Sequence, residues 1–119
     1  MNESFYTNLR NSIVKQAVDD YVYSGKRIKC LLDNKQKTII KIIKNGLELK
    51  KPKFYTYEEA EDEWKARIEK QKGIMIGVEM FFRSMWYKQM CDIDGEYIIA
   101  KTKEKTIRMC GVDLELLQL

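Results

Sequence analysis

Hydrophobic residues recur at every fourth position near the start of the chain. This spacing places them on one face of an α-helix, because a helix completes a turn in about 3.6 residues. Ser4 is a residue type that caps helix starts, and Ser24-Gly25 offers a stop, since glycine readily adopts the left-handed conformation after a helix. We therefore predict a helix over residues 4–24, built on Phe5, Leu9, Ile13, Ala17 and Tyr21.

The next segment, 26–53, combines apolar repeats with many lysines. Ile39 and Ile43 are one helical turn apart, which favours a helix. Their β-branched side chains also suit a strand, and Asn45-Gly46 is a preferred hairpin turn. We prefer the helix, and a small β-hairpin in the 36–57 region is the alternative. Pro52 predicts a loop, because proline disfavours helix at the preceding residue.

A long central helix is predicted over residues 57–91. Thr56 is placed to cap it, with Glu59 three residues later as in a capping box. The stretch that follows is apolar on nearly every side, so this helix should contact neighbours all round. Arg83 marks a break, after which Ser84 can cap a short helix. The main apolar face comprises Trp64, Ile68, Met75, Val78, Phe82 and Trp86.

Two further elements complete the chain. Asp94 is a suitable N-cap for a helix over residues 94–104, and the helix dipole favours the lysines near its end. The tail, residues 106–119, is hydrophobic, and the alternation at Val112 and Leu114 resembles a short strand. The tail either packs on the core or drives association between copies of the chain.

Together these elements predict an all-α or mostly α fold. At 119 residues the chain has the length of one domain, 1–119, and 45% hydrophobic residues supply a modest core. We expect the helices over 4–24 and 94–104 to pack on the central helix. The basic 26–53 segment would form an insertion at one edge.

The amino-acid composition argues against several kinds of catalytic site. The sequence has no histidine, so imidazole metal sites are excluded and Ser12, Ser84 and Cys91 lack the usual activating base. Three cysteines without a CxxC spacing indicate reduced thiols rather than a zinc site or a disulfide framework. Asp19-Asp20 fit an exposed helix face better than a metal site. We expect no enzyme, no metal and no cofactor.

No stretch without a charged residue exceeds six positions, whereas a membrane span needs about 20 apolar residues. The N-terminus also lacks the basic and apolar regions of a signal peptide. These features predict a cytoplasmic protein without membrane contact.

Charge is concentrated in two adjacent blocks. Residues 26–53 carry ten Lys/Arg and two Asp/Glu, a net +8, whereas residues 54–63 carry five acids and no base. A basic block with nearby aromatic rings can track a phosphate backbone, and an acidic block can imitate one; the alternative is that the blocks neutralise each other. The candidate nucleic-acid contacts are Lys41, Lys44, Lys50, Lys51, Lys53 and Tyr55, and the candidate partner contacts are Glu58, Glu59, Glu61, Asp62 and Glu63.

A polar and aromatic cluster around Arg83 and Trp86 is a second candidate surface for partner binding. Exposed Trp, Tyr and Arg side chains dominate binding hot spots. The alternative is a buried corner, in which Arg83 bonds Asp92 or Asp94 and Trp86 belongs to the core.

Two segments resemble a known group of proteins. Val14–Tyr21, which reads VKQAVDDY, is similar to an opening IxQAVxDY; FFRSMWY at Phe81–Tyr87 and DIDGEYII at Asp92–Ile99 are similar to a closing FFRSxWF and DGEYLI. These motifs occur in small uncharacterised proteins of Firmicute phages, prophages and integrative elements. The resemblance covers the first helix and about residues 78–101. It implies an origin on a mobile element and a small helical fold, and it carries over no catalytic residues.

These features favour a non-catalytic protein that binds and inhibits a host protein or ribonucleoprotein complex in the bacterial cytoplasm. An inhibitor of bacterial immunity of the anti-CRISPR type, acting on a CRISPR effector, is the most concrete form. The alternative is a small nucleic-acid-binding accessory or regulatory protein that uses the 26–53 segment. A third possibility is an assembly protein whose tail makes a homo-oligomer.

Overall fold

The structure, a computed structural model, describes residues 3–48, 56–115 and 117. No strand occurs among these residues, so the all-α prediction is confirmed and the small β-hairpin in the 36–57 region is wrong for the part described. Residues 49–55 lie outside the description. The helices, in chain order, are α1 (Glu3–Asp33), α2 (Lys35–Glu48), α3 (Tyr57–Phe82), α4 (Met85–Met90) and α5 (Gly95–Cys110).

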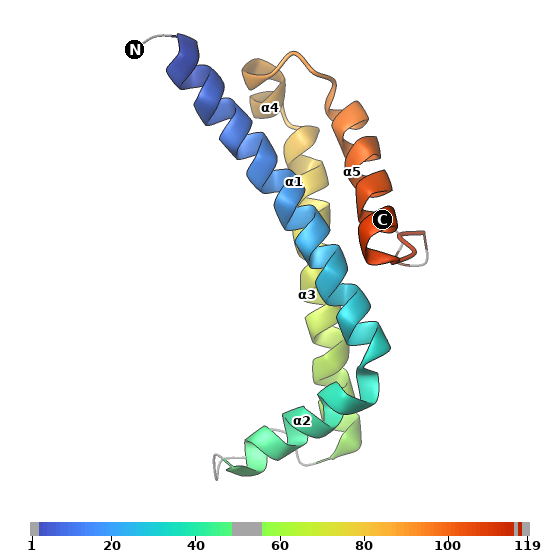
Figure 1. The fold of residues 1–119 in the computed structure, drawn as a ribbon. Coiled ribbons are helices and arrows are strands. Elements are labelled where there is room, and N and C mark those ends of the chain that lie inside the picture. The colour runs from blue at the N-terminus through green and yellow to red at the C-terminus, as the bar shows by residue number, and fades with distance from the viewer. Residues whose placement is uncertain (1–2, 49–55, 116, 118–119) are drawn as a thin grey trace.

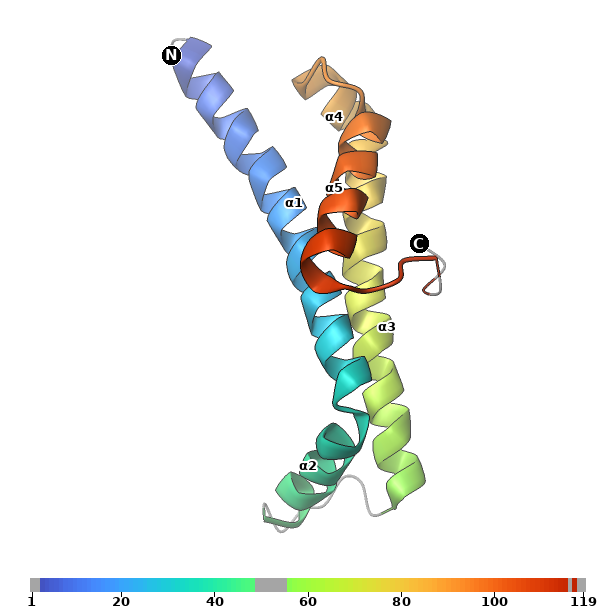
Figure 2. The ribbon, with the colours of Figure 1, turned by 45° about the vertical axis from the view of Figure 1, so that its right-hand side comes forward.

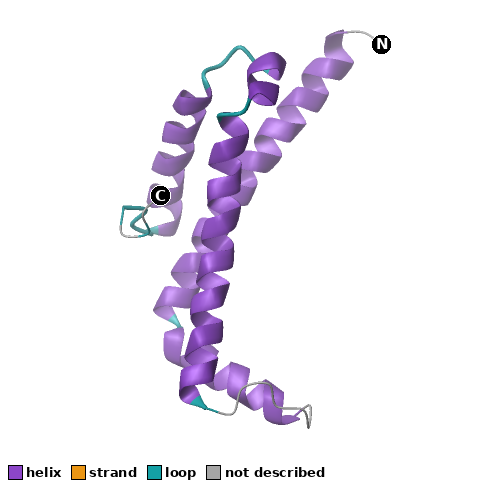
Figure 3. Ribbon diagram, turned by 180° about the vertical axis from the view of Figure 1, so that it is seen from behind, coloured by secondary structure: helices purple, strands orange, loops and turns teal. Residues whose placement is uncertain are grey.

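The molecule is elongated, with extents of 56 × 32 × 22 Å. Helices α1 and α3 run antiparallel along its length, while α2 turns away at one end and the short α4 lies at the other (Figure 1). Helix α5 packs across the α4 half of the α1–α3 pair (Figure 2). Seen from behind, α3 lies in front of both α1 and α5 (Figure 3). Since α3 contacts each of the other four helices, its central position is confirmed. The expectation that it contacts neighbours all round is wrong, because Ile74, Ile76 and Met80 are exposed.

Helix α1 is longer than predicted, because it continues through Ser24-Gly25 to Asp33. Both residues are buried. A Cβ atom added to Gly25 would lie 2.5 Å from Cγ2 of Thr106 in α5. Beside this contact the Cys110 thiol donates to the carbonyl of Val22 at 3.5 Å. The glycine therefore marks a close approach of two helices rather than a helix stop.

Helix α2 follows α1 after a single residue, Asn34. The helical hydrogen bonds continue across it, because the Asn34 N–H donates to the Cys30 carbonyl and the Thr38 N–H donates to the Asn34 carbonyl. The Asn34 side chain also donates to the Cys30 carbonyl, at 2.9 Å. The chain thus bends without breaking, and the described part of the 26–53 segment is shared between the end of α1 and α2.

The core consists of two clusters. The smaller joins the end of α3 to α4 and α5 through Phe82, Tyr87 and Ile99. The larger joins α1, α2, α3 and the tail, and the indole N–H of Trp64 donates across it to the Leu31 carbonyl at 2.7 Å. Its buried members are Tyr21, Ile28, Ile39, Ile42, Ala60, Trp64, Ile68, Met75, Val112 and Leu114.

The tail packs on the core where it is described. Val112 and Leu114 are buried, and they lie in turns and irregular structure rather than in the short strand predicted. Their side chains are therefore not exposed for association between copies. Gly111, with φ of 68°, ends α5 and begins this return.

Three predicted helix caps are confirmed. Thr56 accepts from the Glu59 N–H, Ser84 from the Tyr87 N–H, and Asp94 from the Glu96 N–H. The helix predicted over 57–91 is interrupted after Phe82, where the expected break at Arg83 occurs. The helix predicted over 94–104 extends to Cys110, and Thr102 and Thr106 are buried along it.

We predict opposite effects of alanine at two glycines. Gly25→Ala should lower the free energy of unfolding by about 1–3 kcal/mol, because the new methyl group forces α1 and α5 apart. Gly73→Ala should raise it by up to about 1 kcal/mol, because Gly73 lies inside α3 with nothing within 4 Å of a Cβ atom and alanine favours helix. Urea unfolding followed by circular dichroism measures both. Equal stabilisation by the two substitutions would contradict the close approach at Gly25.

Candidate functional site

Glu79 is a buried carboxylate at the junction of α1, α3 and α5. The Tyr21 hydroxyl donates to its Oε2 at 3.4 Å, and Nζ of Lys103 lies 3.3 Å from its Oε1. A guanidinium nitrogen of Arg83 lies 3.6 Å from the same Oε1. Burial, together with Glu79, raises the pKa of Tyr21, so this phenol stays protonated and donates. These contacts fix the three helices relative to one another.

Arg83 connects the end of α3 to the start of α5. Its Nε donates to Oε1 of Glu96 at 2.6 Å and its Nη2 donates to Oε2 at 3.3 Å. This pair lowers the pKa of Glu96 below its ordinary value. The partners anticipated for Arg83, Asp92 or Asp94, are therefore wrong. Arg83 thus engages both Glu79 and Glu96 and links α3 to α5 at this corner.

Helix α4 is held at its start by Ser84 and in its middle by Tyr87. The Ser84 hydroxyl accepts from the Tyr87 N–H at 3.1 Å and donates to the Phe81 carbonyl at 2.6 Å. The buried Tyr87 donates its hydroxyl to the Ile93 carbonyl at 2.7 Å, and its ring meets Phe82 edge-to-face at 5.2 Å. The side chains on the outer face of α4 are therefore carried on a fixed backbone.

Trp86 projects from that outer face and is 59% exposed. Its ring meets Phe81 edge-to-face, with centroids 5.8 Å apart. The other tryptophan, Trp64, is buried with its indole N–H bonded. The prediction that Trp86 continues the buried face of α3 is wrong, because α4 starts a new helix at Ser84 and the periodicity of α3 does not extend into it. Met85 is exposed beside it.

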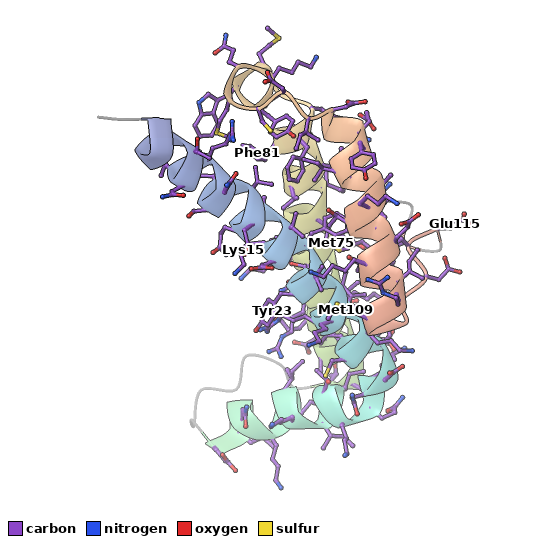
Figure 4. All side chains as sticks on the ribbon, turned by 45° about the horizontal axis from the view of Figure 1, so that its top comes forward. Lys15, Tyr23, Met75, Phe81, Met109 and Glu115 are labelled. Atoms are coloured by element: carbon purple, nitrogen blue, oxygen red, sulfur yellow. The ribbon has the colours of Figure 1, made fainter. Side chains whose placement is uncertain are left out.

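A hollow of about 400 Å³ adjoins Trp86 between α1 and α3. We call it the apolar hollow, because most of its lining is aliphatic or aromatic. Phe81 lies where α1, α3 and α4 meet (Figure 4). The apolar lining comprises Ile13, Ala17, Ile74, Val78, Phe81 and Trp86.

Two more hollows, of about 490 and 400 Å³, continue along the same α1–α3 seam. Asp20 and Ile74 line both the apolar hollow and the middle one, and Arg27 and Lys70 line both the middle and the last. Tyr23, in the middle hollow, lies on the side of α1 away from α5 (Figure 4). We call the three hollows together the docking groove.

The acidic block lies on the first turns of α3 and is partly neutralised. Glu61 pairs with Lys35 of α2 at 3.1 Å and with Lys65 at 3.6 Å, and Lys35 lowers the pKa of Glu61. Glu63 pairs with Arg67 at 3.4 Å. The basic and acidic blocks therefore meet where Lys35 reaches Glu61. Of the other candidates, Glu59 takes part in the cap and Glu58 and Asp62 are exposed.

The basic block has a solvated side on α2. Lys37, Lys41 and Lys44 are exposed, at positions opposite the buried Ile39 and Ile42. No ion pair involves these three lysines among the residues that the structure describes. The other candidates, Lys50, Lys51, Lys53 and Tyr55, lie outside the described residues.

The carboxylates considered for a metal do not converge. Asp19 pairs with Lys15 at 3.6 Å, and Asp20 accepts from Gln16 at 2.7 Å. Within the described ranges, no three His, Cys, Asp or Glu side chains are grouped to hold a metal ion. None of the helices in the same ranges has the length and apolar character needed to cross a membrane.

Comparisons with known proteins give no match for this chain among family models, curated proteins or solved structures.

Sequence reasoning identified Trp86 but missed the docking groove. Ile13 and Ala17 belong to the apolar stripe of α1, which a one-dimensional pattern assigns entirely to the core. Arg27 and Lys70 are distant in sequence, and only the antiparallel pairing brings them together. The sequence feature that could have indicated this groove is Gly77, because a glycine inside an apolar helical stretch leaves space beside the helix.

The Arg83–Glu96 pair predicts a pH dependence of stability. Because the folded-state pKa of Glu96 is below the ordinary 4.5, its stabilisation is present above pH 4.5 and is lost as the pH falls through the folded-state value. Glu96→Gln should therefore be less stable than the native chain at pH 7, and the gap should close in acid. Urea unfolding across this pH range measures it. Glu104→Gln, whose partner Lys101 is at 3.5 Å, is the control, and an equal gap there would contradict the prediction.

Proposed function

We propose that this chain is a non-catalytic protein that docks on a host protein and inhibits it. The observation that carries the proposal is Trp86, an exposed tryptophan on a fixed helix beside the apolar hollow. Tryptophan is the residue type most enriched at binding hot spots, especially next to a pocket that a partner can fill. A rigid support lowers the entropy lost on binding, because little of the surface must be ordered.

The class of partner is proposed from the sequence. The resemblance of VKQAVDDY, FFRSMWY and DGEYII to proteins of Firmicute mobile elements supports a bacterial host protein as the target. The lack of histidine in these 119 residues supports binding rather than catalysis. Inhibition of bacterial immunity, of the anti-CRISPR type, remains the most concrete form of the proposal.

Trp86→Ala tests this function, with Tyr97→Ala as a matched control. Tyr97 is 58% exposed on α5, and it lies outside the docking groove. A nuclease-treated bacterial lysate is used to capture and identify the partner, and its affinity is then measured with purified proteins. We expect Trp86→Ala to weaken binding by more than about tenfold, and Tyr97→Ala to change it by less than about threefold.

Two results would contradict the proposal. One is capture of nuclease-sensitive material alone. The other is a purified partner that binds Trp86→Ala as tightly as the native chain.

The exposed lysines of α2 favour a second candidate, nucleic-acid binding. Lys37, Lys41 and Lys44 recur along one side of the helix, as contacts to a phosphate backbone would require. If this function holds, binding to duplex DNA should weaken steeply with salt, because each phosphate contact releases a counterion. Lys37→Glu/Lys41→Glu should abolish such binding in a mobility-shift titration, and Lys101→Glu/Arg108→Glu on α5 controls for net charge. Weak binding that is the same for both double variants would reject it.

A further inference from the structure

The docking groove changes character along its length. At one end the apolar hollow is walled by α1, α3 and Trp86 of α4. At the other end the last hollow is lined by Arg27, Arg67, Lys70 and Glu63. An occupant of the whole groove must therefore present apolar groups to one end and complementary charge to the other.

Within the described residues, the basic end carries two cations without carboxylate partners. Arg67 is paired with Glu63, but no described carboxylate pairs with Arg27 or Lys70. Arg27 is already positioned, because its Nη1 donates to the Tyr23 hydroxyl at 3.0 Å and its guanidinium lies over that ring at 5.6 Å. Charge complementarity at this end favours carboxylates.

The apolar end is open to a close approach. Ile74 is 39% exposed at the boundary with the middle hollow, and nothing lies within 4 Å of a Cβ atom built on Gly77. A glycine at this position inside α3 weakens the helix. It also leaves space in which the backbone of another helix can lie close to α3.

The walls of the groove favour a helical occupant over an extended one. Both walls are helices, whose internal backbone groups are already hydrogen-bonded, so an extended peptide would leave its own N–H and C=O groups without partners. A helix satisfies its backbone internally and needs only side-chain contacts. From Arg67 to Phe81 along α3 the groove covers roughly 21 Å, which is about four turns of a helix.

We propose that the docking groove binds an amphipathic helix of the partner protein, with apolar side chains over Ile74 and Phe81 and Asp or Glu side chains at Arg27 and Lys70. This inference rests on the proposed function, since it specifies the segment of the partner that meets Trp86. A second copy of this chain and a nucleic-acid strand are the other occupants, and the experiment separates them.

A library of displayed helical peptides, each about 18 residues long, tests the preference of the groove without the native partner. The intact chain is the bait. We expect enriched peptides to carry apolar residues at helical spacing in one half and acids in the other. The affinity of a selected peptide, followed by fluorescence anisotropy, should fall by at least about tenfold for Ile74→Gln and for Arg27→Glu/Lys70→Glu. Lys101→Glu/Arg108→Glu on α5, which lies outside the docking groove and changes the net charge equally, should leave the affinity within about threefold.

Several outcomes would overturn the proposal. Enriched peptides without acids, or peptides that bind the Arg27→Glu/Lys70→Glu variant as well as the native chain, would show that acidic side chains do not bind at Arg27 and Lys70. Displacement of a selected peptide by single-stranded DNA would assign the groove to phosphate. A dimer in analytical ultracentrifugation that Ile74→Gln dissociates would assign it to a second copy. Each variant is first checked by circular dichroism.

The two proposals can fail separately. If the host partner depends on Trp86 but the library shows no preference for acids, the chemistry inferred for the helix is wrong and the function stands. If selected peptides bind the groove but no host protein binds less tightly to Trp86→Ala, the proposed function is wrong and the inferred preference of the groove for acidic helices is retained.

Discussion

A carboxylate that leaves water must gain partners, because an unpaired buried charge costs several kcal/mol. Glu79 gains three, and each comes from a different turn or helix: Tyr21 of α1, Lys103 of α5, and Arg83 one turn further along. An aliphatic side chain at this place would tolerate small rotations of the helices. A hydrogen-bonded carboxylate restricts them, since the charge is satisfied only in one arrangement. Through Arg83 the same restriction extends to Glu96 at the start of α5.

The α1–α3 pair is covered unequally on its two sides. On one side α5 lies so close that Gly25 has no room for a side chain. On the other side no helix of the described part of the chain covers the seam, and apolar side chains such as Ile74 stay partly exposed between charged neighbours. The helices that form the docking groove are held by contacts on the covered side, such as Gly25 against Thr106 and Glu79 against Lys103.

Local chemistry made the helix starts predictable. Thr56, Ser84 and Asp94 cap their helices through bonds to backbone N–H groups two or three residues away, which sequence spacing alone describes. The predictions that were wrong concerned positions whose environment is set by residues far away in the sequence. Glycine is the residue type expected at the end of a helix. Only the contact with Thr106, far away in the sequence, shows that Gly25 instead lets α5 pack closely on α1. Trp86 fitted the period of α3, and the change of direction after the Ser84 cap removed it from that face.

Contacts between residues far apart in the sequence also determine the order in which the helices can assemble during synthesis. Tyr21 meets Glu79 across 58 residues, and Cys110 meets Val22 across 88 residues. A growing chain can thus pair α1 with α3 before α5 emerges from the ribosome, because long-range contacts form only after both segments emerge. At that stage Glu79 still faces water on the side that α5 will cover, so its charge is hydrated while Lys103 is missing. Among the described helices, α5 is therefore the one whose arrival replaces this water with an ammonium group, that of Lys103.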